Sequence, residues 1–89
     1  MSYSVNYSDD ALKSLKKIDR HKAKIIVGWI EKNLIGCENP RRHGKALRHD
    51  RKDEWCYRVG TYRLIADIQD RVVTIEIINV GHRKGIYKA

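Results

Sequence analysis

Apolar and polar residues alternate through three short runs in the C-terminal half of the chain, between Trp55 and Tyr87. The runs are separated by two short polar breaks, Gly60-Thr61 and Asp70-Arg71. This pattern predicts three consecutive antiparallel strands that are joined by two-residue turns.

Two-residue turns fix which side chains face one another across the strands. The first turn places Arg58 opposite Arg63, and the second places Ile68 opposite Val73. One face of the sheet is then continuously apolar or aromatic and predicts the core: Trp55, Tyr57, Val59, Tyr62, Leu64, Ala66, Ile68, Val73, Ile75 and Ile77. The other face carries a mixed set: Cys56, Arg58, Arg63, Ile65, Asp67, Thr74, Glu76 and Ile78.

The first forty residues predict one short strand and a pair of helices. Residues 2–7 alternate as a strand does, and Ser8 and Asp19 are each placed to cap a helix. The apolar positions that follow repeat at helical spacing and end at Gly36: Ala11, Leu12, Leu15 and Ile18, then Ala23, Ile26, Val27, Ile30 and Leu34. On a flank of the second helix, Ile25 and Trp29 form either the edge of the core or an apolar patch for a partner.

Residues 36–53 are basic, hold the only proline, and predict a loop with one helical turn around Lys45 to Arg48. The resulting order is β-α-α-β-β-β, which predicts an α+β fold. In it, a small antiparallel sheet carries a helical hairpin on its apolar face, and a short C-terminal tail follows. We expect residues 1–89 to form a single domain, because the sequence shows no linker and no internal repeat.

The net charge of +8, from 19 Lys and Arg against 11 Asp and Glu, points to a polyanion such as nucleic acid. The excess lies mainly in residues 41–89, although solubility alone also accounts for many basic domains. No apolar run is long enough to span a membrane and the start lacks a signal peptide, so we expect a cytoplasmic protein. Cys37 and Cys56 lie far apart and predict neither a metal site nor a disulfide.

The opposed pair Arg58 and Arg63 is the most specific chemical signal in the sequence. Directly opposed side chains on neighbouring strands have Cβ atoms about 4.5–5.5 Å apart, and like charges there lower stability. An anion between the two guanidinium groups would offset this cost, because arginine matches phosphate oxygens with two parallel hydrogen bonds. The alternative is that both side chains extend separately into water.

The residues after the last predicted strand add His82, Arg83, Lys84 and Tyr87 to the arginine face. The sequence holds no phosphate-binding glycine loop and no paired carboxylates at a plausible site. Cations with one imidazole and one aromatic ring suit the cleavage of RNA by its own 2′-hydroxyl, since the protein need only orient the nucleophile, neutralise the phosphorane and move protons. Tyr87 is placed to stack on a base.

Three motifs resemble the RelE/ParE superfamily of bacterial type II toxins, on the RelE side. They are W-x-Y-R-V-G-x-Y-R-L (55–64), V-G-H-R-x-x-x-Y (80–87) and Y-S-x-x-A-L-K-x-L-K-K (7–17). The resemblance implies an endoribonuclease that needs no cofactor and cleaves mRNA in the A site of the ribosome. It also implies a RelB-like antitoxin that wraps and silences the toxin, in a hetero-oligomer that represses its own operon through the antitoxin.

The resemblance also suggests roles for individual residues. Arg63 matches an arginine that stabilises the phosphate, Arg83 one that protonates the leaving 5′-oxygen, and Tyr87 a tyrosine that stacks on the scissile nucleotide. Lys45 and Arg48 match basic loop positions that contact RNA.

The chain departs from the family pattern at two positions. Cys56 stands where relatives often have a basic residue, and Arg58 stands where many have a lysine proposed as general base. A guanidinium does not deprotonate near neutral pH, so we expect His82 or His43 to take the proton instead.

Two other functions are compatible with the pattern. The first is a ParE-like inhibitor of DNA gyrase, which would share the fold and the antitoxin but need no catalytic residues. The second is a basic RNA-binding module without toxicity, which would expose aromatic rings on its sheet. The aromatic residues here fall on the predicted core face, which disfavours the second.

Overall fold

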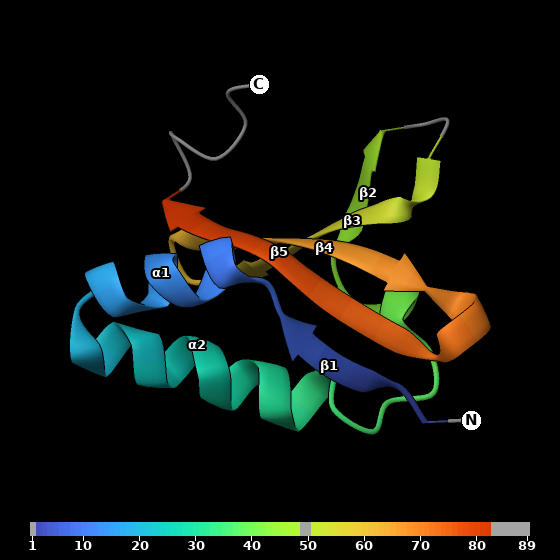
Figure 1. The fold of residues 1–89 in the computed structure, drawn as a ribbon, viewed down its shortest axis with the longest axis horizontal. Coiled ribbons are helices and arrows are strands. Elements are labelled where there is room, and N and C mark those ends of the chain that lie inside the picture. The colour runs from blue at the N-terminus through green and yellow to red at the C-terminus, as the bar shows by residue number, and fades with distance from the viewer. Residues whose placement is uncertain (1, 49–50, 83–89) are drawn as a thin grey trace.

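The computed structural model describes residues 2–48 and 51–82, which form two helices and a five-stranded sheet (Figure 1). The elements in chain order are β1 (Ser4–Tyr7), α1 (Asp9–Lys17), α2 (Arg20–Asn33), β2 (Lys45–Arg48), β3 (Arg51–Val59), β4 (Tyr62–Gln69) and β5 (Thr74–His82). The strand order is β1-β5-β4-β3-β2, with β1 parallel to β5 and every other pair antiparallel. The predicted α+β class is confirmed, with one more strand than expected and a mixed rather than antiparallel sheet.

Both predicted helix caps are present. The Ser8 hydroxyl accepts a hydrogen bond from the Ala11 amide at 3.0 Å and donates one to the Ile78 carbonyl at 2.6 Å. The Asp19 carboxylate accepts from the Lys22 amide at 3.3 Å. Ser8 therefore ends β1, begins α1 and ties that helix to β5, which α1 packs against.

The core lies between the helices and the apolar face of the sheet, as predicted. Its buried residues come from both layers: Ala11, Ile26, Ile30 and Leu34 from the helical side, and Tyr57, Val59, Leu64, Ala66, Ile75, Ile77 and Val80 from the sheet. Figure 1 shows both helices on one side of the twisted sheet, with β2 turned away from them. On the flank of α2, Trp29 packs against this core, whereas Ile25 is 53% exposed.

The first predicted turn is confirmed. Val59 pairs with Tyr62 and Arg58 with Arg63, so Gly60 and Thr61 form the two-residue connection. Gly60 has a φ of +59°, a conformation that glycine adopts without steric cost and that suits a tight hairpin.

The second predicted turn is wrong, because the connection is longer than Asp70-Arg71. A single 3₁₀ turn, Asp70–Val72, is followed by Val73 with a φ of +49°, and pairing resumes with Gln69 opposite Thr74. Ile68 therefore faces Ile75 rather than Val73. The observed register of β4 and β5 differs from the predicted one by two residues. Because side chains alternate with a period of two, the residues predicted to face the core near this turn still do so.

Tertiary contacts explain the wider turn. The Asp70 carboxylate accepts a hydrogen bond from the Tyr3 hydroxyl at 2.6 Å and two from the Arg41 guanidinium at 3.1 and 3.0 Å. The Val73 carbonyl accepts from the Ser4 amide at 2.9 Å. These contacts hold the turn against distant parts of the chain and stabilise a left-handed valine that local preference disfavours.

A β-bulge in β5 changes which residues face the helices beyond it. Ile65 pairs with Asn79 but Ala66 pairs with Ile77, so Ile78 is the extra residue. The bulge turns Val80 into the core, where it is 3% exposed and lies opposite Leu64.

The helical turn predicted around Lys45 to Arg48 is also wrong, since these residues form the edge strand β2. Lys45 pairs with Cys56 and Ala46 with Trp55, and β3 begins at Arg51 instead of near Trp55. Isolated helix preference in a four-residue segment is weak, and pairing with the exposed edge of β3 satisfies the backbone groups of that strand.

Two aromatic side chains of β3 hold the segment that precedes β2. The buried Tyr57 hydroxyl donates to the Pro40 carbonyl at 2.6 Å, and the Trp55 indole N–H donates to the His43 carbonyl at 2.6 Å. Burial, the larger cause, and the nearby Cys37 thiol raise the pKa of Tyr57 well above its usual range.

Tyr57→Phe is expected to lower the free energy of unfolding by about 1–3 kcal/mol at pH 7, because it leaves a buried carbonyl without its donor. Since the pKa of Tyr57 is raised in the folded state, its contribution is complete below pH ~10 and is lost as the pH rises above that value. Urea unfolding between pH 7 and pH ~11 measures both effects. A variant as stable as the wild type at pH 7, or one whose stability falls as steeply in alkali, would contradict this role.

Candidate functional site

The two arginines predicted to form a pair lie on the face of the sheet that is turned away from the helices. Arg58 in β3 pairs directly with Arg63 in β4, so both side chains leave the same face. Arg58 is exposed, whereas Arg63 is only 8% exposed. On the far side of β4, Arg63 pairs with Gly81, which contributes no side chain to this face.

Both arginines line a cavity of about 240 Å³ at the junction of β2, β3 and β4, with Gly44, Lys45 and Cys56. A second hollow of about 80 Å³, toward the hairpin turn, is also lined by Arg58 and Arg63. We call the larger of these two hollows, which Gly44, Lys45, Cys56, Arg58 and Arg63 line, the cation cavity.

The charged groups that line the cation cavity are all positive. Lys45, Arg58 and Arg63 contribute three cations, and within residues 2–48 and 51–82 no carboxylate lines the cavity. Three cations around a small hollow favour an anionic group, and the planar guanidinium groups suit a phosphate. Of the two RNA-binding residues predicted in the basic loop, the structure therefore brings Lys45 to the arginines.

Cys56 is 4% exposed and lines the cation cavity between Lys45 and Arg58. It is a free cysteine, as is Cys37, and its thiol lies 3.8 Å from the Tyr57 carbonyl. A basic residue at this position would add a fourth cation, so the cavity here is less positive than the family pattern implies.

The two candidate histidines pack against aromatic rings. His82 pairs with Tyr62, and their rings meet edge to face at 5.2 Å. His43 meets Trp29 of α2 edge to face at 5.8 Å. The prediction that His82 joins the arginine face is wrong, because His82 lies opposite Tyr62 and successive strand residues face opposite sides of the sheet. Neither histidine is among the residues that line the cation cavity.

Three of the predicted site residues, Arg83, Lys84 and Tyr87, lie outside the described residues, as does the expected C-terminal tail. Arg48 lies in β2, where its backbone pairs with Arg51.

Arg41 is a contact residue that the sequence analysis did not identify. Besides its two hydrogen bonds to Asp70, its guanidinium contacts Asp53 at 3.2 Å and lies 5.9 Å from the centre of the Trp55 ring. The hydrogen bonding of its guanidinium to the Asp70 carboxylate is the main reason that the pKa of Arg41 is raised. The same carboxylate raises the pKa of Tyr3. This cluster joins the N-terminus, the η1 turn (Pro40–Arg42) and the β4–β5 turn; a lone arginine in a basic loop gives no such signal in the sequence.

Within residues 2–48 and 51–82, no three His, Cys, Asp or Glu side chains gather in a way that would hold a metal ion. In the same part of the chain, neither helix has the length and apolar character needed to cross a bilayer.

Comparison with known proteins gives a consistent family. Residues 5–87 match the model of the ParE toxin of the type II toxin–antitoxin system parDE. Toxin RelG of Mycobacterium tuberculosis is 33% identical over 99% of both chains, and toxin RelE of the same organism is 30% identical over 97% of this chain and 87% of its own. The crystal structure of the toxin–antitoxin complex RelBE2 from M. tuberculosis contains a chain that is 31% identical, with a TM-score of 0.80 over 93% of this chain and 100% of that chain.

These comparisons agree with the motifs around the arginine pair. They include a family match along almost the whole chain, the identity to two known toxins and the shared fold. The chain is a type II toxin and belongs to the RelE/ParE superfamily.

Proposed function

We propose that this toxin is a ribosome-dependent endoribonuclease that cleaves mRNA in the A site. The observation that carries the proposal is the cation cavity, in which Arg58, Arg63 and Lys45 surround a hollow of about 240 Å³. A toxin that acts only by binding a protein has no need of two opposed arginines on an open sheet face. An RNA phosphate between them would offset their repulsion and gain charge-assisted hydrogen bonds.

In the proposed reaction, the 2′-hydroxyl of the substrate attacks the adjacent phosphorus and the 5′-oxygen leaves, which gives a 2′,3′-cyclic phosphate and a 5′-hydroxyl. Arg63 and Arg58 neutralise the additional negative charge of the phosphorane. Arg83 donates the proton that the leaving oxygen takes, which a guanidinium can do because the leaving alkoxide is a much stronger base than guanidine. Tyr87 stacks on the scissile nucleotide to align the attack. Lys45, Arg48 and Lys84 bind flanking phosphates, which requires only positive charge.

A base must accept the proton of the 2′-hydroxyl, and we assign this role to an imidazole. His82 and His43 are each next in the chain to a glycine of this region, Gly81 and Gly44. Their rings contact Tyr62 and Trp29, so either imidazole must turn toward the cation cavity when RNA binds. Single-turnover cleavage by His82→Ala and by His43→Ala identifies the base, and unchanged rates in both variants would remove imidazole from the mechanism.

The proposed partners are the ribosome with its mRNA, in the cytoplasm, and a RelB-like antitoxin. A solved relative, RelBE2, is itself a toxin–antitoxin complex. The antitoxin would silence the toxin and carry the complex to operator DNA.

A cleavage assay on ribosomes tests the proposal. Purified toxin is added to ribosomes programmed with a defined message, and primer extension maps the cuts. We expect cuts in phase with codons that appear only when ribosomes are present. An intact message under these conditions would overturn the proposal.

The alternative is inhibition of DNA gyrase, which is favoured by the match of residues 5–87 to the ParE toxin model. A supercoiling assay with purified gyrase tests it on the same preparation. Loss of supercoiling together with an intact message would assign the protein to this second function.

A further inference from the structure

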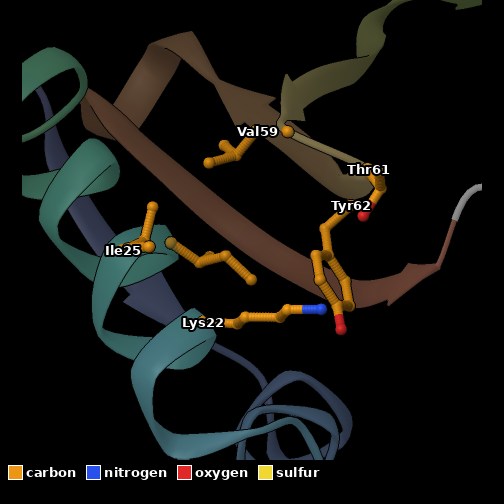
Figure 2. Close-up of a pocket in the computed structure, with 7 residues that line it drawn as sticks. Lys22, Ile25, Val59, Thr61 and Tyr62 are labelled. Carbon is orange, nitrogen blue, oxygen red and sulfur yellow. The ribbon is translucent and has the colours of Figure 1, made fainter.

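A groove separate from the cation cavity lies between α2 and the β3–β4 hairpin. It is lined by Lys22, Ile25, Ile26, Val59, Gly60, Thr61 and Tyr62, and has a volume of about 150 Å³. Figure 2 shows Lys22 and Ile25 projecting from α2 toward Val59 and Tyr62 of the hairpin. We call this feature the α2–hairpin groove.

The lining of the α2–hairpin groove is almost entirely apolar, and its outer wall is Ile25, which is 53% exposed. A cavity of about 150 Å³ with apolar walls accommodates a group the size of a benzene ring. The groove therefore fits one large apolar side chain, such as leucine or phenylalanine, and such a side chain would cover Ile25.

A cation lines the groove, and further basic residues lie on the same helix. That cation is Lys22, and its amine lies beside the Tyr62 ring (Figure 2). The first turns of α2 also carry Arg20, His21 and Lys24, and α2 has no acidic residue in its first turn. The surroundings favour an acidic partner segment around the apolar side chain.

The groove is continuous with the arginine face through the hairpin turn. Gly60, Thr61 and Tyr62 line both the α2–hairpin groove and the hollow of about 80 Å³ that Arg58 and Arg63 share. A chain that is anchored in the groove and crosses Gly60-Thr61 reaches the arginine pair directly.

We infer that the α2–hairpin groove anchors the antitoxin, through one apolar side chain of an acidic segment whose carboxylates continue over the hairpin turn to Arg58 and Arg63. The inference rests on the proposed antitoxin partner. It adds the place where the toxin holds the antitoxin and the way in which the antitoxin covers the two arginines. RNA is a poorer occupant, because the lining offers almost no hydrogen-bonding groups to phosphates or to the edges of a base. A second copy of the toxin is also poorer, because each copy carries a net charge of +8.

Ile25→Glu tests the anchor, because it puts a charge into the apolar groove while glutamate keeps good helix preference. The matched control is Leu12→Glu, which makes the same change at a position of α1 that is 44% exposed. The antitoxin encoded beside the toxin is titrated against each purified variant. We expect at least tenfold weaker binding for Ile25→Glu, a change of less than threefold for Leu12→Glu, and wild-type mRNA cleavage by both when free.

A second pair of variants tests the charge of Lys22. Lys22→Glu is expected to weaken antitoxin binding at low salt, and the loss should shrink as salt rises. Lys24→Glu, on the same helix but outside the groove lining, is expected to have a smaller effect.

Three results would overturn the inference. The first is equal antitoxin affinity for Ile25→Glu and Leu12→Glu. The second is loss of ribosome-dependent cleavage in Ile25→Glu with antitoxin binding unchanged, which would make the groove a ribosome contact. The third is a wild-type dimer in sedimentation that Ile25→Glu dissociates without changing antitoxin affinity. If wild-type toxin binds the antitoxin but leaves mRNA intact, only the proposed nuclease activity is refuted. The antitoxin affinities of Ile25→Glu and Leu12→Glu still show whether the groove is the anchor.

Discussion

Arg63→Ala is expected to slow mRNA cleavage on ribosomes by about 100- to 1,000-fold, the usual cost of removing one group that stabilises a developing negative charge. Arg63 lines the cation cavity, is only 8% exposed and lies between Arg58 and Gly81 in the sheet, so it has little freedom to move away from a bound phosphate. The measurement is single-turnover cleavage with the toxin in excess over programmed ribosomes, so that the chemical step is observed.

Because Arg63 is buried, its loss can also affect folding, and two further variants separate the effects. Arg58→Ala removes the exposed partner and is expected to slow cleavage at least tenfold with an unchanged urea midpoint. Arg71→Ala makes the same change at an exposed residue of the β4–β5 turn, far along the sheet, and should leave the rate unchanged. Cleavage within threefold of wild type by both Arg63→Ala and Arg58→Ala would exclude the cation cavity as the catalytic site.

Gly44→Ala is expected to lower the free energy of unfolding by about 2–4 kcal/mol, which is large for the addition of one methyl group. Gly44 has a φ of +70°, and a Cβ there would lie 2.2 Å from the Cys56 carbonyl oxygen and 3.0 Å from the Tyr57 ring. The carbonyl belongs to the backbone of β3, so it has no flexible side chain that can yield. The substitution should separate β2 from β3, move Lys45 away from the arginines and reduce cleavage.

Two other glycines provide matched controls for this prediction, which urea unfolding measures. Gly36 has a similar φ of +79° but nothing within 4 Å of an added Cβ, so Gly36→Ala should cost only the conformational strain, about 1–2 kcal/mol. Gly28 lies inside α2 with open space around it, and Gly28→Ala should stabilise the protein by about 0.5–1 kcal/mol. If Gly44→Ala lowers the free energy of unfolding by no more than Gly36→Ala does, the close contact with the Cys56 carbonyl does not contribute to the loss of stability.

Features that depend on neighbouring residues were predictable from the sequence. Ser8 and Asp19 cap helices because a side-chain oxygen lies within reach of an amide three residues later. Gly60-Thr61 forms a two-residue turn, and that turn alone places Arg58 opposite Arg63. The predicted opposition of the two arginines was correct because it required only one short hairpin.

Features that depend on distant residues were not predictable. A two-residue turn was predicted at Asp70-Arg71, but the observed turn is wider because Tyr3 and Arg41 bind Asp70. The segment Lys45–Arg48 became a strand because the edge of β3 was available for pairing.

The sequence by itself determined the helix caps, the two alternating faces of the sheet and the opposed arginines, because each follows from the side-chain period of a helix or strand and from one tight turn. Only the tertiary structure decided the length of the second turn, the bulge that turns Val80 inward, the edge strand that brings Lys45 to the arginines, and the groove beside Ile25. Their free energies come from contacts between residues far apart in the chain, and a local pattern carries no information about which distant partner will be present.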